Sequence, residues 1–171
     1  MKNMLFVLLV VVFFVGISYS PSTSTQVSDG LVYHGTACIL KNGVLQGSCT
    51  HNIVVDGGRT MVQQSLGLGV NNTINQLAIG NSSAPSASDV ALASEWSSCG
   101  LSKAVATYSS NGVGSWNMVY TWTSACDNVF VNTTALYKNG GALFAGLGVT
   151  PTTFQTNDKV TINYTLAINN G

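Results

Sequence analysis

The sequence is short of charge. Lys, Arg, Asp and Glu make up 7% of its 171 residues, whereas a typical soluble domain has about 25%. The six basic and six acidic side chains cancel, so the chain lacks a basic stripe with which to hold a phosphate backbone. We therefore expect no nucleic-acid partner. With 46% hydrophobic residues, the chain is also too apolar to be disordered, and its polarity comes from Ser, Thr and Asn.

Residues that carry catalysis are scarce as well. Either of the two histidines, His34 and His51, could act as a general base, but a surface histidine is the simpler interpretation. No G-x-S-x-G elbow, P-loop or G-x-G-x-x-G fingerprint occurs. Helix starts and turns explain several of the scattered acidic residues, so we expect no catalytic residue and no cofactor. The acidic residues are Asp29, Asp56, Asp89, Glu95, Asp127 and Asp158.

The first residues have the order of a secretory signal peptide. In MKNMLFVLLVVVFFVGIS, one Lys precedes an apolar run from Met4 to Ile17, and small residues follow. We expect residues 1–18 to be cleaved as a signal peptide, so that the chain meets a membrane only during export. A retained anchor and a pilin leader are the alternatives. As a helix the apolar run would span about 21 Å, less than the roughly 30 Å of a bilayer core, which favours cleavage.

Export would place the four cysteines in an oxidising compartment, where an even number predicts two disulfides. Closeness in sequence favours Cys38–Cys49 and Cys99–Cys126. The first pair meets a difficulty, because a two-residue hairpin turn at Asn42–Gly43 would set Cys38 opposite Gly47. A bulge near Gly47 or a longer loop would bring the two sulfurs together. The spacings do not resemble the paired CxxC ligands of a zinc site, so we expect no metal.

From Leu31 onward the apolar residues mostly recur with a period of two. In KVTINYTLAIN, five alternate apolar residues from Val160 to Ile168 share one face of a strand. Further strands are expected in KAVATYS, VGSWNMVYTWTS, NVFVNTTALYK and GALFAGLGV, with tight turns at Asn111–Gly112 and Asn139–Gly141. We therefore predict a mainly β fold, an antiparallel β-sandwich of the jelly-roll or Ig-like type, as a single domain over residues 37–171.

One segment breaks the strand pattern. DGGRTMVQQSLGLG begins with Asp56, a good N-cap, and reaches Gly67, which can end a helix. We expect a short helix over 58–66. Its apolar face would carry Met61, Val62 and Leu66.

A second short helix is conceivable in LAIGNSSAPSASDVALASEW. Here we expect a core strand that ends at Gly80, a loop stiffened by Pro85, and one helical turn capped by Ser88 or Asp89. This framework explains the carboxylate of Glu95 better than acid–base chemistry does.

Two features concern the surface. Four Asn-x-Ser/Thr sequons are expected to carry glycans if the exporting host glycosylates, and Asn163 would lie on the polar face of its strand. A stripe of aromatic residues in VGSWNMVYTWTS could bind carbohydrate, although such a stripe is more often core. The sequons are at Asn71, Asn81, Asn132 and Asn163, and the stripe comprises Trp116, Tyr120 and Trp122.

Three stretches share a recognisable pattern. They are HNIVVDGGRTMVQQSLGLG, INQLAIGNSSAPSASDVALASEW and ALYKNGGALFAGLGVTPTTFQTNDKVTINYTLAI. The pattern resembles a family of small β-rich structural proteins of tailed phages and archaeal viruses, found in tail fibres and on virion surfaces. The resemblance covers the chain from His51 to its end and implies a virus-like structural scaffold. The matching residues are Gly57, Gly58, Arg59, Ile79, Gly80, Pro85, Asp89, Leu92, Glu95, Gly140, Gly141, Leu143 and Ala145.

The chain also departs from that family. It has a leader, cysteines and sequons, and Trp96 stands where the family usually has a basic residue. These differences suit a protein assembled outside the cell. Secreted archaeal filament subunits are similar in broad architecture, and some of them polymerise by donor-strand complementation.

We therefore expect a secreted, non-enzymatic subunit of an extracellular filament, pilus-like thread or virion appendage, whose partner is a second copy of itself. Residues 19–36 would form an N-terminal tail, with the donor strand over 22–36 and Val27, Leu31 and Tyr33 as its subunit contacts. A surface adhesin that binds a cell-surface receptor or a glycan is the alternative. A secreted hydrolase is the third interpretation.

Overall fold

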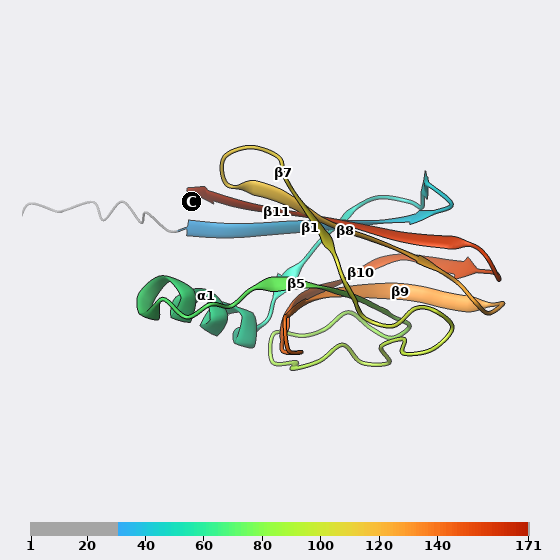
Figure 1. Cartoon of the computed structure of the whole chain (residues 1–171), viewed down its shortest axis with the longest axis horizontal. Helices are drawn as coiled ribbons and strands as arrows, with labels where there is room; N and C mark the ends of the chain where they lie inside the picture. The colour runs from blue at the N-terminus through green and yellow to red at the C-terminus, as the bar shows by residue number, and fades with distance from the viewer. Residues whose placement is uncertain (1–30, 171) are drawn as a thin grey trace, which may run out of the picture.

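The computed structural model describes residues 31–170, in which two antiparallel β-sheets pack face to face (Figure 1). The molecule is thus the mainly β sandwich that the alternating sequence predicts. The expected signal peptide of residues 1–18 lies outside the described residues, as does Val27 of the expected donor strand.

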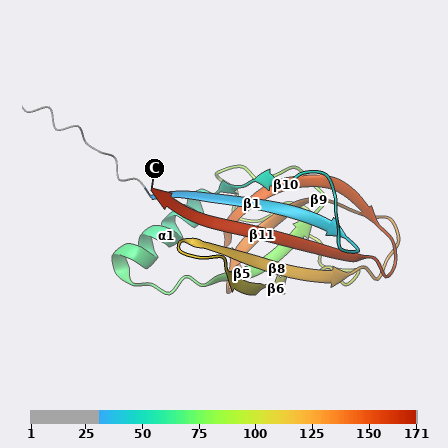
Figure 2. The ribbon, with the colours of Figure 1, turned by 90° about the horizontal axis from the view of Figure 1, so that it is seen from above.

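The first sheet, sheet A, contains both ends of the described chain. Its strands follow the order β2-β1-β11-β8-β7, and β3 also pairs with β1. The C-terminal strand β11 lies between β1 and β8, antiparallel to both (Figure 2). The strands are β1 (Leu31–Lys41), β2 (Val44–Leu45), β3 (Thr50–His51), β7 (Thr107–Ser110), β8 (Ser115–Thr123) and β11 (Lys159–Asn170).

The second sheet, sheet B, has the order β4-β10-β9-β5-β6. Strand β10 runs on past the segment that the sequence predicted. Its pairing with β9 shifts register between Gly148 and Thr152, and this irregularity accommodates Pro151 within a strand. The strands are β4 (Ile53–Val54), β5 (Ile74–Gly80), β6 (Ala104–Val105), β9 (Val129–Lys138) and β10 (Leu143–Phe154).

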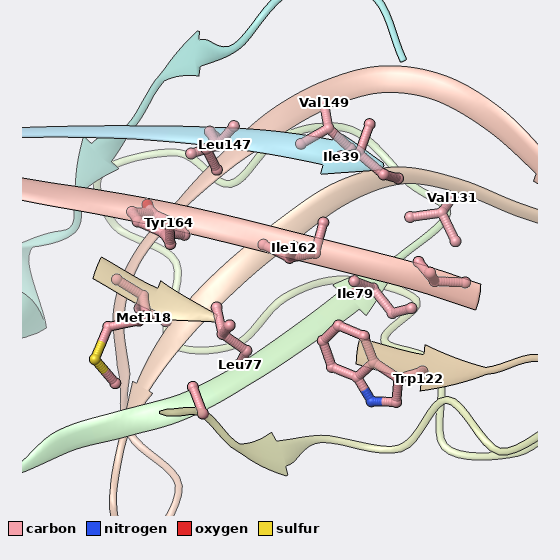
Figure 3. Packing of buried hydrophobic residues seen from close by; sticks show 14 of the residues in the cluster. Ile39, Leu77, Ile79, Met118, Trp122, Val131, Leu147, Val149, Ile162 and Tyr164 are labelled. Carbon is pink, nitrogen blue, oxygen red and sulfur yellow. The ribbon is translucent and has the colours of Figure 1, made fainter. Parts of the chain in front are cut away.

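The main core lies between the sheets (Figure 3). Strand β11 contributes alternate residues to it, and all of these except Ile168 are at most 1% exposed. Strand β8 faces the same core, so Met118 and Trp122 are buried against it. The predicted alternation therefore identified the inward face of both strands.

A second, smaller core lies on the outer face of sheet B, under the segment 81–96. Leu92 is buried there, and its main-chain N–H donates to the Tyr137 hydroxyl at 2.7 Å. The segment therefore serves as a cover for the sheet. This core comprises Val55, Ala78, Leu92, Ala135, Tyr137 and Leu143.

The helical turn expected near Ser88 or Asp89 is absent, because the residues of SDVALASEW form turns and a bridge instead. Gly80 and Glu95 form that isolated antiparallel bridge, and the Trp96 N–H donates to the Ile79 carbonyl at 2.9 Å. These bonds use the free edge of β5, which a helix would leave unpaired. The prediction of helix was wrong because the tertiary pairing outweighs the local capping signal.

Helix α1 spans Asp56–Leu68 and is longer at both ends than the expected 58–66. Val55 is the N-cap residue, without a side-chain cap, and Asp56 lies in the first turn, where a carboxylate favours the helix dipole. The helix passes Gly67 and ends at Gly69, whose φ is +66° and whose N–H donates to the Gln64 carbonyl. The left-handed C-cap therefore falls at the later glycine.

The boundary expected between a tail and a domain at residue 37 comes too late. Strand β1 begins at Leu31 and pairs with β11 from Leu31↔Asn170 onward. Leu31 and Tyr33 thus belong to this chain's own sheet rather than to a free tail. The strand starts this early because its pairing with β11 is long. On the side that faces β11, the main-chain groups of residues 31–36 are all paired.

Both disulfides, Cys38–Cys49 and Cys99–Cys126, have the predicted pairing. The Asn42–Gly43 turn sets Leu40 opposite Leu45, whereas β3 sets Ala37 opposite Thr50. The register therefore shifts between β2 and β3, next to Gly47, whose φ is +67°. This irregularity is the bulge that the first pair requires.

Candidate functional site

The two ends of the sandwich differ. At the helix end, α1 lies beside the ends of β1 and β11, and the described chain both begins and finishes there (Figure 1). At the loop end, the turns that follow β1 and β8 meet the turn that precedes β11. The candidate site lies at the helix end.

A groove of about 780 Å³ opens between α1 and the inner face of sheet A. Its volume is in the range of ligand pockets and peptide clefts. We call it the helix-end groove. Its apolar lining includes Tyr33, Met61, Leu66, Trp116, Phe144 and Ile168, and its polar lining includes Asn52, Arg59 and Asn72.

Aromatic rings form the wall of the groove on the sheet side. The Tyr33 ring meets Trp116 edge to face at 5.9 Å and Phe144 at 5.5 Å between centroids. Burial raises the pKa of the Tyr33 hydroxyl well above its usual value. These are core-type contacts, yet β1 and β8 here face a groove rather than a packed sheet.

The helix supplies the opposite wall. Gly58 lets α1 approach β10 closely, because a Cβ at this position would overlap the Phe144 carbonyl. Met61 is buried by this approach, whereas Leu66 on the same helix is 72% exposed. The expected apolar face of the helix therefore packs at its start and stays open near its end.

Exposed apolar side chains lie at the helix end, and three of them, Ile53, Leu66 and Ile168, line the groove. The exposed side chains come from the C-terminal end of α1 and the residues that follow it, from β4, from the end of β11 and from the turn before β8. That turn is joined to β11, because the Ile168 N–H donates to the Gly114 carbonyl. Contiguous exposed apolar patches often belong to interaction sites, which makes this end the candidate site. The residues are Ile53, Leu66, Leu68, Val70, Val113 and Ile168, each at least 39% exposed.

Two amides are the uncharged polar groups of the groove that matter most. Asn72 donates to the Met61 carbonyl and to the Ser65 hydroxyl, but its Oδ1 is buried without a partner. Asn52 Nδ2 is also buried without a hydrogen bond of good geometry, although it lies beside the Tyr164 hydroxyl. An unpaired buried polar atom costs about 1–3 kcal/mol, so both amides gain from an occupant that offers hydrogen bonds.

The fold does not bring the two histidines to this groove. His34 and His51 lie exposed on the outer face of sheet A, where His51 pairs opposite Thr36. Two of the acidic residues form ion pairs instead of gathering at the groove. Asp158 lies 2.9 Å from Lys41, and Glu95 lies 3.5 Å from Lys103. Within residues 31–170, no three His, Cys, Asp or Glu side chains gather as metal ligands.

Two more of the acidic residues lie in turns and accept hydrogen bonds from main-chain N–H groups. Asp89 accepts the Ser86 N–H at 2.7 Å, and Asp127 accepts the Thr156 N–H at 2.8 Å. Asp56 instead lies 3.7 Å from Arg59 on the exposed start of α1. Asp29 lies outside the described residues.

The aromatic stripe of β8 faces the core. Trp122 is 3% exposed, and its indole N–H donates to the Ser102 carbonyl at 2.7 Å. Tyr120 meets Trp122 edge to face at 4.8 Å. Trp116 alone of the three reaches the groove. An exposed aromatic platform is therefore absent from this strand.

The four sequons lie in different surroundings. Asn71 and Asn81 are exposed in loops, and the Asn71 Oδ1 accepts the Thr73 hydroxyl at 2.7 Å. Asn132 and Asn163 are half-buried on strands, each with its Oδ1 atom buried. Glycosylation stays a prediction at all four, and the loop sites offer a glycan the most room.

Little in the sequence indicates the groove. Leu66, Leu68 and Val70 alternate with Gly67 and Gly69, which suggested only a helix end. Their exposure at the end of α1 is the feature that sequence reasoning missed. In the part of the chain that the structure describes, no helix has the length and apolarity to span a bilayer.

Comparison with known proteins leaves the helix-end groove without a precedent. Neither a protein-family model, nor a curated protein, nor a solved structure matches the chain. The resemblance to viral structural proteins therefore stays a prediction.

Proposed function

We propose that the chain is a secreted, non-enzymatic structural subunit that assembles with copies of itself, by addition of a β-strand, into an extracellular filament or appendage. The observation that carries the proposal is the apolar helix end, with its open groove and exposed Leu66 and Leu68. A chain with 7% charged residues has little electrostatic repulsion between copies, so such an apolar surface favours association.

Two further features support this function. Both disulfides fix the sandwich covalently, as suits a protein that works in an oxidising compartment. The outer edge of β7 consists of Thr107–Ser110, all of them exposed and uncharged, and an unprotected strand edge can pair with another chain. The described residues thus offer surfaces for association and a stable body between them.

A glycan-binding module is the second candidate, because Tyr33 and Trp116 line the groove beside two amides. However, these two rings meet each other edge to face, so they do not form the flat platform on which a sugar stacks. Trp122, the third ring of that hypothesis in strand β8, is buried. The assembly function therefore has the stronger support.

The test is the association state of the purified, oxidised chain, measured by sedimentation and negative-stain microscopy. We expect concentration-dependent assemblies in the wild type and a loss of at least about ten-fold in association for Leu66→Asp, since a charge would enter the apolar contact. Circular dichroism should be unchanged, because Leu66 is 72% exposed.

Val44→Asp is the matched control, since Val44 is 65% exposed on β2, away from the groove. A wild-type chain that stays monomeric at every concentration contradicts the proposed function. An equal loss in both variants would move the interface away from the helix end.

A further inference from the structure

We propose that the helix-end groove is the acceptor for residues 19–30 of a second copy of this chain. This inference rests on the proposed function and names its partner segment. Three observations support it: where the described chain begins, which main-chain edge lies free beside the groove, and which side chains line it.

The first observation concerns the start of β1. Leu31 pairs with Asn170 at the helix end, and Tyr33 lines the groove. Each copy therefore sends its preceding segment out from the same end that carries the acceptor. Residues 19–30 reach about 40 Å when extended, which is enough to cross to the groove of a neighbouring copy.

The second observation is the free edge of β1. On the side away from β11, strand β3 pairs with β1 only at Thr36 and Ala37, and the Asn52 N–H donates to the Gly35 carbonyl. Among the described residues, no strand pairs with residues 31–34 on that side. An added strand could therefore continue the line of β3 along β1 and bond to its main chain.

The third observation is the lining. A strand on that edge presents alternate side chains to one face, and the groove offers apolar contacts to them from Met61, Leu66 and Phe144. Asn52 and Asn72, each with an unpaired amide atom, can take up main-chain N–H and C=O groups of an incoming segment. The segment contains such a mixture, with Val27 among polar residues.

A second copy fits better than the same chain. Asp29 and Gly30 could form a favoured two-residue hairpin turn that folds the preceding residues back along β1. That register would set Val27 opposite Val32, on the face that alternates away from the groove-lining Tyr33. A segment from another copy is not bound to this register. Occupation by the same chain is accordingly one outcome of the test.

The experiment mixes two variants of the full chain under mild oxidation, Val27→Cys in one and Leu66→Cys in the other, each with one cysteine added beside the two native disulfides. We expect a disulfide-linked species joining residue 27 to residue 66, in about ten-fold or greater yield than the mixture of Val27→Cys with Val44→Cys, because docking raises the effective concentration of the two thiols. A linked pair of chains whose cross-link maps to residues 27 and 66 supports the inference.

Equal yields at residues 66 and 44 would overturn the inference. So would a Val27→Cys/Leu66→Cys double variant whose link forms within one chain and does not fall on dilution. If the wild-type chain assembles but residue 27 does not link to residue 66, this inference fails and the proposed function stands. If the chain does not assemble at all, the proposed function fails with it.

Discussion

At the loop end, ion pairs, caps and a disulfide join the turns, whereas at the helix end apolar side chains stand exposed around a groove. The loop end holds Asp158 between Lys41 and Asn42, with contacts of 2.9 and 2.7 Å. Asn42 in turn accepts the Lys159 N–H at 2.7 Å. The polar groups of this end are therefore satisfied by the chain itself.

The helix end has the opposite character. Its apolar rim includes Leu66 and Leu68, both more than 70% exposed, and both disulfides lie outside the groove lining. The loop end exposes Val44 and Leu45 on β2 as well, so what distinguishes the helix end is that exposed apolar side chains there line a groove. Three predictions test that contrast, from the largest expected effect to the smallest.

Removal of the Cys99–Cys126 disulfide should cost the most. The bond joins residues separated by 27 positions and lies beside the turn that leads into β9. The double variant Cys99→Ala/Cys126→Ala should lose about 3.5 kcal/mol in the free energy of unfolding, because its unfolded chain regains the entropy of that loop. Urea unfolding measures the loss.

The control is Cys38→Ala/Cys49→Ala, whose separation is 11 positions. The shorter loop predicts a smaller loss, about 2.8 kcal/mol. A larger loss in this control than in the first variant would contradict the loop-entropy argument. If the loop-entropy argument holds, hydrogen exchange should show faster opening at the loop end for Cys99→Ala/Cys126→Ala and not for the control.

Gly58→Ala should separate the helix from the sandwich. Its Cβ would overlap the Phe144 carbonyl, so α1 must move outward, at a cost of about 1–3 kcal/mol in unfolding free energy. Thermal or urea unfolding measures this change. The groove should widen as well and expose Trp116, which should shift the tryptophan fluorescence of the chain, to which Trp96 and Trp122 also contribute.

Gly57→Ala is the matched control on the same helix. A Cβ there would lie 3.5 Å from the Leu143 carbonyl, an ordinary contact. The replacement should stabilise the chain by up to about 1 kcal/mol, because alanine favours helix over glycine. Equal destabilisation by both variants would mean that close packing at Gly58 does not anchor α1.

Acid should weaken the loop end first. The pKa of Asp158 is lowered to about 2 by the Gln155 main-chain N–H, with further help from Lys41 and Asn42. Because the pKa is about 3.9 in an unfolded chain, this carboxylate contributes stability fully above that value and loses it as the pH falls toward 2. The urea midpoint of the wild type should therefore fall over this window.

Asp158→Asn should flatten that fall, because the variant lacks the titrating group. The pKa of Asp127 is also lowered, chiefly by the main chain of Thr156, so Asp127→Asn should remove a smaller part. A wild-type and an Asp158→Asn profile that run parallel between about pH 4 and 2 would show that this network does not stabilise the fold.

The sequence predicted the strands well because alternation reports directly on burial. In β11, the residues from Val160 to Leu166 that it assigned to the core are those that are buried. The pairing of the cysteines followed from their separation, and the bulge by Gly47 from the mismatch of a two-residue turn. These features depend on a few neighbouring residues.

Other features depend on partners distant in sequence. The segment after Ser88 reads as a helix start, but pairing with the edge of β5 holds it in turns. Leu66 reads as a core residue by its spacing, but it borders the open groove and is 72% exposed. Neither outcome is encoded in a local pattern.

By itself, the sequence determined the class of the fold, the inward faces of its strands and its two disulfides, since side-chain period and cysteine spacing act over short distances. Only the tertiary structure decided that β1 starts at Leu31, that α1 stands at one end, and that a groove remains there. The physical reason is that a groove remains where elements distant in sequence do not pack against each other. The relative lengths of the two sheets and the helix decide where that happens.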